Sequence, residues 1–207
     1  MFKKSKLVCL IAGIFLTLTP FITSSSYAYA NEAYDQSLNE TQKVVDSQLK
    51  KMEHMTVSEK ADEVNRLLKQ YEGMSLTLDT PLSRNVKPAQ PSTEVKVVNG
   101  GINFFAYNKE GINKLANIFA NLSFSEGFIG GSGGVAGLIA AALGLGSALT
   151  AGLAGILAAL GSYAFTYFGA ARDIMREHDK AEHKKAGVRI SVTEVLDITN
   201  KGINAYG

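Results

Sequence analysis

Two histidines late in the chain are the residues whose types come closest to a chemical site. His178 is followed by Glu182 four residues later, and His183 is preceded by Asp179 four residues earlier. Helical zinc sites place two histidines four residues apart on one face, as in His-Glu-x-x-His. The five-residue spacing found here puts the two rings on different faces of a helix, so we expect no metal. A pH-responsive charge near a membrane suits these histidines better.

The other patterns that would support catalysis are incomplete. Residues 131–136 (GSGGVA) match a dinucleotide-binding fingerprint, which also needs a preceding strand and an acidic residue about 20 positions later. The next acidic residue is Asp173, which is too distant. No Gly-Lys-Ser/Thr follows the glycines, as a phosphate-binding loop would need. The only cysteine, Cys9, lies in a leader, so the mature chain has no thiol nucleophile. We therefore expect no enzyme activity and no cofactor.

The first 30 residues have the parts of a secretory signal peptide. Three lysines within residues 1–6 precede an apolar run over 7–22, and Ala28-Tyr29-Ala30 places small residues at −3 and −1 of a cleavage site. We expect residues 1–30 to be removed and the mature chain to be secreted. An uncleaved N-terminal anchor is the alternative, although the apolar run is short for a spanning helix.

Composition and charge limit the function of the mature chain. The protein has 207 residues, of which 46% are hydrophobic and 19% are charged. Without the leader, 18 basic and 19 acidic residues remain, which is a net charge of −1. Strongly basic nucleic-acid binders have a one-sided excess of Lys and Arg, so we expect no nucleic-acid partner.

Residues 31–78 are predicted to form an amphipathic helical module. Apolar residues recur at helical spacing over 34–55, and a second helix over 57–71 follows a capping box of Thr56 and Glu59. Gly73 is a typical left-handed stop. Residues 79–93 contain all three prolines of the mature chain and are predicted to be a linker, because proline interrupts helices and central strands.

Residues 94–207 are predicted to form a second domain that begins with a small β-hairpin. Residues 94–98 and 102–107 are β-branched and aromatic runs around Asn99-Gly100, a pair that can adopt positive φ at both turn positions. Asn108 begins an amphipathic helix, and alternation over 188–193 predicts a short strand. The predicted fold class is mainly α: an N-terminal helical hairpin, this small β-hairpin, and a hydrophobic Gly/Ala-rich helical hairpin.

The Gly/Ala-rich hairpin is predicted from a stretch without any charge. Residues 127–171 are 45 uncharged residues, of which 12 are Gly and 12 are Ala. Two spanning helices of about 20 residues each fit this length. We expect arms over 128–143 and 148–168, joined at 144–147. A closed helical hairpin satisfies its own backbone hydrogen bonds, as hydrocarbon requires.

Small residues four positions apart recur along both arms, which lets helix backbones approach closely in lipid. Tyr163 and Tyr167 are expected at the headgroup level, followed by charged residues in water. The residues that we expect to act in membrane insertion are Gly130, Gly134, Gly137, Gly144, Gly152, Gly155, Tyr163 and Tyr167. The competing interpretation is a pair of buried core helices in a soluble protein, because periodicity alone does not separate the two.

The second half of the chain has a recognisable order of elements. Val95–Val98 precedes a turn and an aromatic strand, and residues 113–122, the Gly/Ala run, His178-Asp179-Lys180 and Gly187–Ile190 follow. Residues 94–207 in this order resemble exported Gly/Ala-rich bacteriocin-like peptides of Gram-positive bacteria. The resemblance implies a secreted antimicrobial or toxin that acts on a lipid bilayer by permeabilising a competitor's membrane. The expected partners are the lipid bilayer and, through self-association in the membrane, other copies of the chain. Residues 31–93 are additional to it, as a pro-region or a docking module.

A cell-envelope protein is the second class of function that fits the sequence. In that class the uncharged stretch anchors the protein, and the helical module binds partners. The two classes differ in localisation: an anchored protein stays in the membranes of its producer, whereas a toxin is found in the culture medium. The sequence indicates no particular protein receptor.

Overall fold

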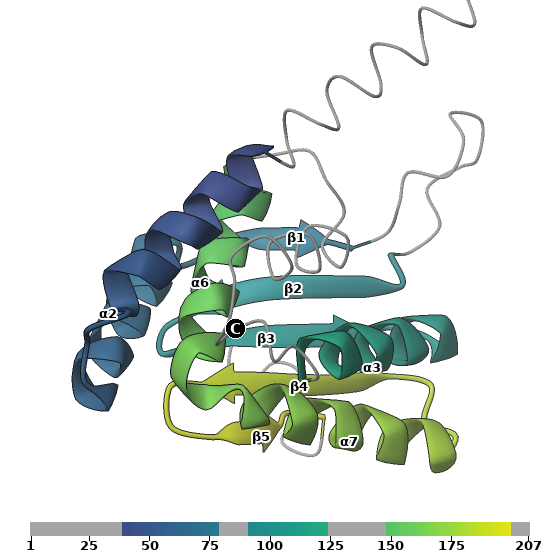
Figure 1. The fold of residues 1–207 in the computed structure, drawn as a ribbon. Helices are drawn as coiled ribbons and strands as arrows, with labels where there is room; N and C mark the ends of the chain where they lie inside the picture. The colour runs from purple at the N-terminus through teal and green to yellow at the C-terminus, as the bar shows by residue number, and fades with distance from the viewer. Residues whose placement is uncertain (1–38, 79–90, 124–147, 200–207) are drawn as a thin grey trace, which may run out of the picture. The chain divides into compact units, whose positions relative to one another are not determined.

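The structure, a computed structural model, describes residues 39–78, 91–123 and 148–199. In these residues, helices lie on one face of a five-stranded antiparallel sheet (Figure 1). The helices are residues 39–52, α2 (Val57–Gln70), α3 (Lys109–Ser123), α6 (Ala148–Ala164) and α7 (Thr166–Lys180). The strands, in sheet order, are β1 (Ser75–Thr77), β2 (Thr93–Val98), β3 (Gly101–Ala106), β4 (Ala186–Ser191) and β5 (Val195–Asp197).

The start of α2 is the capping box that the sequence predicts. The Glu59 amide donates to Thr56 Oγ1 at 3.3 Å, and the Thr56 amide donates to the Glu59 carboxylate at 2.7 Å. These two bonds satisfy amides that have no partner inside the helix. The predicted apolar face is also confirmed, because Val64 and Leu68 are buried. α2 ends at Gln70, and Gly73 then takes the left-handed conformation with φ of +84°.

The predicted β-hairpin is formed by β2 and β3, with Val98 opposite Gly101. Its turn differs from the expectation in one respect. Gly100 has a φ of +73°, but Asn99 does not adopt positive φ, since Glu182 is the only described residue other than glycine that does. The Asn99 carbonyl accepts a hydrogen bond of 2.5 Å from the Arg189 guanidinium on β4, a contact that local sequence does not reveal.

The fold class is mixed α and β rather than purely α, so the expectation of a mainly α protein with one small β-hairpin is confirmed only in part. The predicted hairpin is the centre of a larger sheet, in which β4 pairs with β3 and β1 pairs with β2. The short strand expected over 188–193 is found as β4, two residues earlier in the chain. β1 and β5 have three residues each, too few for an alternating pattern to predict them.

The core lies between the sheet and the helices. α3 packs on α7, and both lie along the strands (Figure 1). The Phe104 ring of β3 meets the Phe119 ring of α3 edge-to-face at 4.9 Å. Asn108 begins α3 as predicted, because its side chain accepts from the Gly111 amide at 2.8 Å. The expected apolar face of this helix is buried at Ile112 and Leu115.

The sheet also joins the two expected domains. β1 belongs to the expected module 31–78, and it pairs with β2 of the expected domain 94–207. Thr93, the last residue of the expected linker, is the first residue of β2 and is buried. All described residues belong to one structural unit, residues 38–207. The expected signal peptide and residues 79–90 of the linker lie outside the described residues.

Candidate functional site

α6 is the described helix of the uncharged stretch, and it is a core helix. Most of its 17 residues are Ala or Leu, which have high helix propensity. The side chains of Leu153, Ile156, Leu157 and Leu160 are at most 1% exposed and belong to the same core as the strand residues. In this state of the protein, the interpretation of a buried helix in a folded core therefore describes α6.

The predicted second arm, 148–168, is interrupted by a bend. α6 begins at Ala148 but ends at Ala164, and α7 begins two residues later. Within the described residues, no single helix is long and apolar enough to cross a bilayer; α6 and α7 meet that test only together, as a pair bent by 105°. Phe165 lies at the bend with 46% of its surface exposed. The predicted first arm, its join at 144–147, and Gly130, Gly134, Gly137 and Gly144 lie outside the described residues.

Gly152 and Gly155 are the described members of the predicted insertion glycines, and both face the N-terminal helices. A Cβ at Gly152 would stand 2.6 Å from Tyr71 Cε1, which is closer than such atoms approach. A Cβ at Gly155 would stand 3.2 Å from Val44 Cγ1. Small residues thus allow close packing here, as the sequence predicts, but the described partner is the N-terminal helix pair. The sequence analysis missed Tyr71 and Val44 as partners, because no local pattern links them to α6.

A buried carboxylate holds the N-terminal helices together. Glu63 of α2 is 6% exposed and bonds Lys51 Nζ at 2.8 Å, Arg66 Nη2 at 2.8 Å and Gln48 Nε2 at 3.2 Å. The Arg66 hydrogen bonds, with those from Lys51 and Gln48, lower the pKa of Glu63 to about 2 despite its burial. The carboxylate is therefore ionised at neutral pH and joins residues 39–52 to α2.

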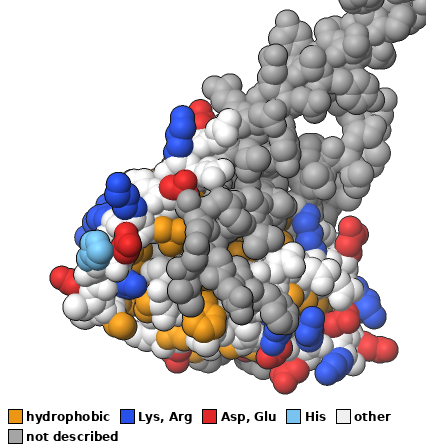
Figure 2. All heavy atoms as spheres, viewed as in Figure 1, with side chains coloured by type: hydrophobic (Ala, Val, Ile, Leu, Met, Phe, Trp, Pro, Cys, Tyr) orange, Lys and Arg blue, Asp and Glu red, His pale blue; other side chains and the backbone are white. Residues whose placement is uncertain are grey.

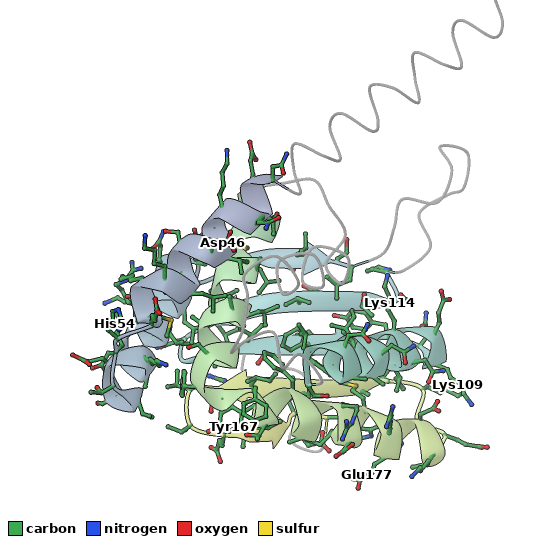
Figure 3. The ribbon with its side chains drawn as sticks, in the orientation of Figure 1. Asp46, His54, Lys109, Lys114, Tyr167 and Glu177 are labelled. Carbon is green, nitrogen blue, oxygen red and sulfur yellow. The ribbon has the colours of Figure 1, made fainter. Side chains whose placement is uncertain are left out.

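Tyr163 and Tyr167 lie on either side of the bend. The Tyr163 hydroxyl donates to the Val192 carbonyl at 3.3 Å, and burial raises the pKa of this phenol to about 12. Tyr167 is half-buried near the start of α7, and Figure 3 shows it beside the bend. Both side chains pack against the core in this structure. Their expected place at the headgroup level is a property of a membrane-bound state and stays a prediction.

The histidines form a structural cluster at the other end of α7. His178 Nε2 lies 3.0 Å from Asp197 Oδ2 and 3.0 Å from Thr199 Oγ1, and Thr199 Oγ1 donates to Asp197 Oδ1 at 2.6 Å. A catalytic triad needs its hydroxyl and carboxylate on opposite ring nitrogens. Here the Asp197 carboxylate and the Thr199 hydroxyl both lie against Nε2. The cluster therefore joins α7 to the end of β5 and to the residues that follow it. The sequence analysis missed Asp197 and Thr199, since they lie about 20 residues away.

The histidines do not converge on a metal site. The His178 and His183 ring centres are 4.9 Å apart, but in the part of the chain that the structure describes no three His, Cys, Asp or Glu side chains are arranged to hold an ion. The third histidine of the mature chain, His54, follows helix 39–52. It lies far from Glu177, the neighbour of His178 on α7 (Figure 3). His178 is already bonded to a carboxylate and a hydroxyl, which leaves the cluster a structural role.

One described hollow has a volume of about 530 Å³. It is lined by Tyr107, Asn108, Lys109, Glu182, His183 and Lys184. The Tyr107 hydroxyl donates to Glu94 at 2.6 Å, and burial together with this carboxylate raises the pKa of Tyr107 to about 12. Such a phenol is a poor acid–base group near neutral pH. The described lining residues include no Ser, Thr or Cys nucleophile.

Charge is distributed around α6 rather than on it. Figure 2 shows Lys, Arg, Asp and Glu side chains on the N-terminal helices and towards α7, with hydrophobic side chains between them. Comparison of the chain with protein-family models, curated proteins and solved structures found no match.

Proposed function

We propose that the mature chain is a secreted, membrane-active protein, and that the uncharged stretch 127–171 is the part that enters a target bilayer. The leader supports secretion, and 45 residues without a charge support insertion. The function is not enzymatic in this proposal: its partner is the bilayer, and its activity is permeabilisation by bacteriocin-like or toxin-like action. Self-association in the membrane belongs to the same proposal.

The observation that carries the proposal is that the uncharged helix α6 is buried in the hydrophobic core. A helix satisfies its own backbone hydrogen bonds, so hydrocarbon can replace apolar protein contacts around it. The 17 described residues of α6 span about 25 Å, and the hydrocarbon core is roughly 30 Å thick. The predicted arm 148–168 would span about 31 Å as one straight helix. Insertion therefore requires the bend at Phe165 to open.

The test is dye release from liposomes by purified residues 31–207. An acid at Gly152 would meet the Tyr71 ring in the folded protein, so we choose Phe165, which is 46% exposed. Phe165→Asp should change folded stability little, because surface substitutions usually stay within about 0.5 kcal/mol. A charge at a helix centre costs about 2.5 to 3.5 kcal/mol on insertion and less near an end. We expect leakage to fall about tenfold.

Val57→Asp is the matched control, because Val57 is also an exposed apolar residue, at 69%, and lies outside the uncharged stretch. It should leave leakage unchanged. Equal leakage by the two variants would remove the stretch from the mechanism. The location of the protein in a producing culture separates a released toxin from the alternative of an anchored envelope protein that binds partners. Protein confined to the producer's membranes would favour the anchor.

A further inference from the structure

The helix pair, defined as residues 39–52 together with α2, is bonded within itself by charge. Glu63 joins Gln48, Lys51 and Arg66 across the two helices. Contacts from the helix pair to α6 are of a different kind. Among the described residues, the only hydrogen bond between them is the weak one from Ser162 Oγ to Met52 Sδ, at 3.9 Å. Charged and polar bonds therefore hold the helix pair together, whereas its contacts with α6 are mainly apolar.

The contact between the helix pair and α6 uses the small-residue side of α6. Tyr71 meets Gly152 and Val44 meets Gly155, one turn apart on α6. The large side chains such as Leu153 and Leu157 lie elsewhere around the helix, at 100° per residue. A hollow of about 320 Å³ opens at the contact and is lined by residues of all three helices. Separation of the helix pair would thus break few polar bonds and would uncover an uncharged helix.

Gly73 lies between the helix pair and the sheet. It has a φ of +84°, and no atom lies within 4 Å of the place that a Cβ would take. Its amide donates to the Val97 carbonyl at 3.0 Å, and β1 begins two residues later with Ser75 opposite Lys96. Rotation of the backbone at Gly73 would break the bond to Val97 and the bond from the Met74 amide to the Tyr71 carbonyl, while the pairing of β1 with β2 could stay in place.

We infer that the helix pair is a cover that lifts from α6 as one body, about Gly73, when the protein meets a lipid surface. Lifting exposes the uncharged side of α6 to hydrocarbon, while the charged Glu63 network stays in water. The folded, covered form keeps the insertion helix out of water until a bilayer is present. This inference rests on the proposed function, because it specifies what controls the insertion of α6.

A reversible lock tests the cover. Val44→Cys with Gly155→Cys places two thiols where Val44 Cγ1 and a Gly155 Cβ position are 3.2 Å apart, within reach of an S–S bond of about 2 Å. The only native cysteine, Cys9, is in the leader, so residues 31–207 contain no other thiol. We expect the oxidised protein to release dye from phosphatidylglycerol-containing liposomes at least tenfold more slowly than the same protein after reduction. The Val44→Cys single variant, treated identically, should leak at the same rate with and without reductant.

A distance measurement tests the same movement without using leakage. Spin labels at Asn65→Cys on α2 and Asn99→Cys on the β2–β3 turn occupy two exposed positions. The distance between the labels should increase when the liposomes are added. Equal leakage by oxidised and reduced lock variants, or an unchanged label distance on liposomes that the parent chain permeabilises, would overturn the cover. If the parent chain causes no leakage, the proposed function fails, and the distance alone decides: an increase supports the cover, and no change overturns it.

Discussion

The Tyr71 ring lies against the backbone of Gly152, so closely that a Cβ on α6 would stand 2.6 Å from Tyr71 Cε1. The contact joins the C-cap residue of α2 to the N-terminal part of the described helix α6. Glycine at this position is therefore explained by packing in the folded protein. A role in membrane helix packing, which the sequence predicts for the same residue, would be an additional constraint on it.

Gly152→Ala should destabilise the protein although alanine is the better helix former. The overpacked contact costs about 1 to 3 kcal/mol. Alanine gains about 1 kcal/mol in helix propensity over glycine, so the net effect is destabilising when the contact cost lies in the upper part of its range. Gly169→Ala on α7 is the matched control, because its nearest neighbour would be Ser123 Cβ at 3.9 Å, an ordinary contact. It should stabilise by about 0.5 to 1 kcal/mol. Urea unfolding measures both, and changes of the same sign would contradict the packing argument.

The Glu63 network should make stability depend on pH in the acid range. The pKa of Glu63 is lowered from 4.5 to about 2, so its ionised form stabilises the fold above pH 4.5. This contribution is lost as the pH falls from 4.5 towards 2. Glu63→Gln should cost about 1 to 2 kcal/mol at pH 7, because the partner cations Lys51 and Arg66 are about half exposed. The difference in unfolding free energy from wild type should shrink below pH 4.5; a constant difference down to pH 2 would count against the network.

Local patterns in the sequence predicted much of the fold. The capping box of Thr56 and Glu59 and the Asn108 cap define helix starts through bonds that span three residues. The alternation over 188–193 predicted β4 for the same reason, since the side-chain period is local. The full sheet was not predictable in this way. β1 and β5 become strands only through pairing with β2 and β4, which depends on contacts between distant parts of the chain.

The candidate site shows the same division. The absence of charge over 127–171 is visible in the sequence, and the described helix α6, Ala148–Ala164, lies within the predicted arm 148–168. The bend after Ala164 is not visible, because no proline or charged residue marks it. The Tyr71 contact and the Asp197 partner of His178 join residues that are far apart in sequence, so no periodicity reveals them.

The His178 cluster should stabilise the end of the sheet. His178→Ala removes a side chain that is 6% exposed and leaves Asp197 and Thr199 without it, at a cost of about 2 to 4 kcal/mol. The Ile198 amide, which donates to Gly187 at 3.2 Å, should then exchange with solvent faster. His54→Ala is the control: His54 is exposed, and its loss should change stability by less than about 0.5 kcal/mol. Normal protection of Ile198 in the His178 variant would show that the cluster does not hold the strand.

The bend between α6 and α7 provides a test of the inserted form that leaves the folded form nearly intact. Thr166 is exposed and is the first residue of α7, a position that tolerates proline, although the αR backbone of Phe165 (φ −57°, ψ −28°) is less favourable before a proline. In a straight helix over 148–168, the same proline would clash with the preceding turn and remove a hydrogen bond, at about 3 kcal/mol. Thr166→Pro should therefore keep the circular dichroism of the folded protein. It should reduce liposome leakage by tenfold or more, because a tenfold change requires only about half of that cost. Thr166→Ala, which favours the straight helix, should leak at least as fast as wild type. Leakage by the proline variant at the wild-type rate would show that the bend does not open during insertion.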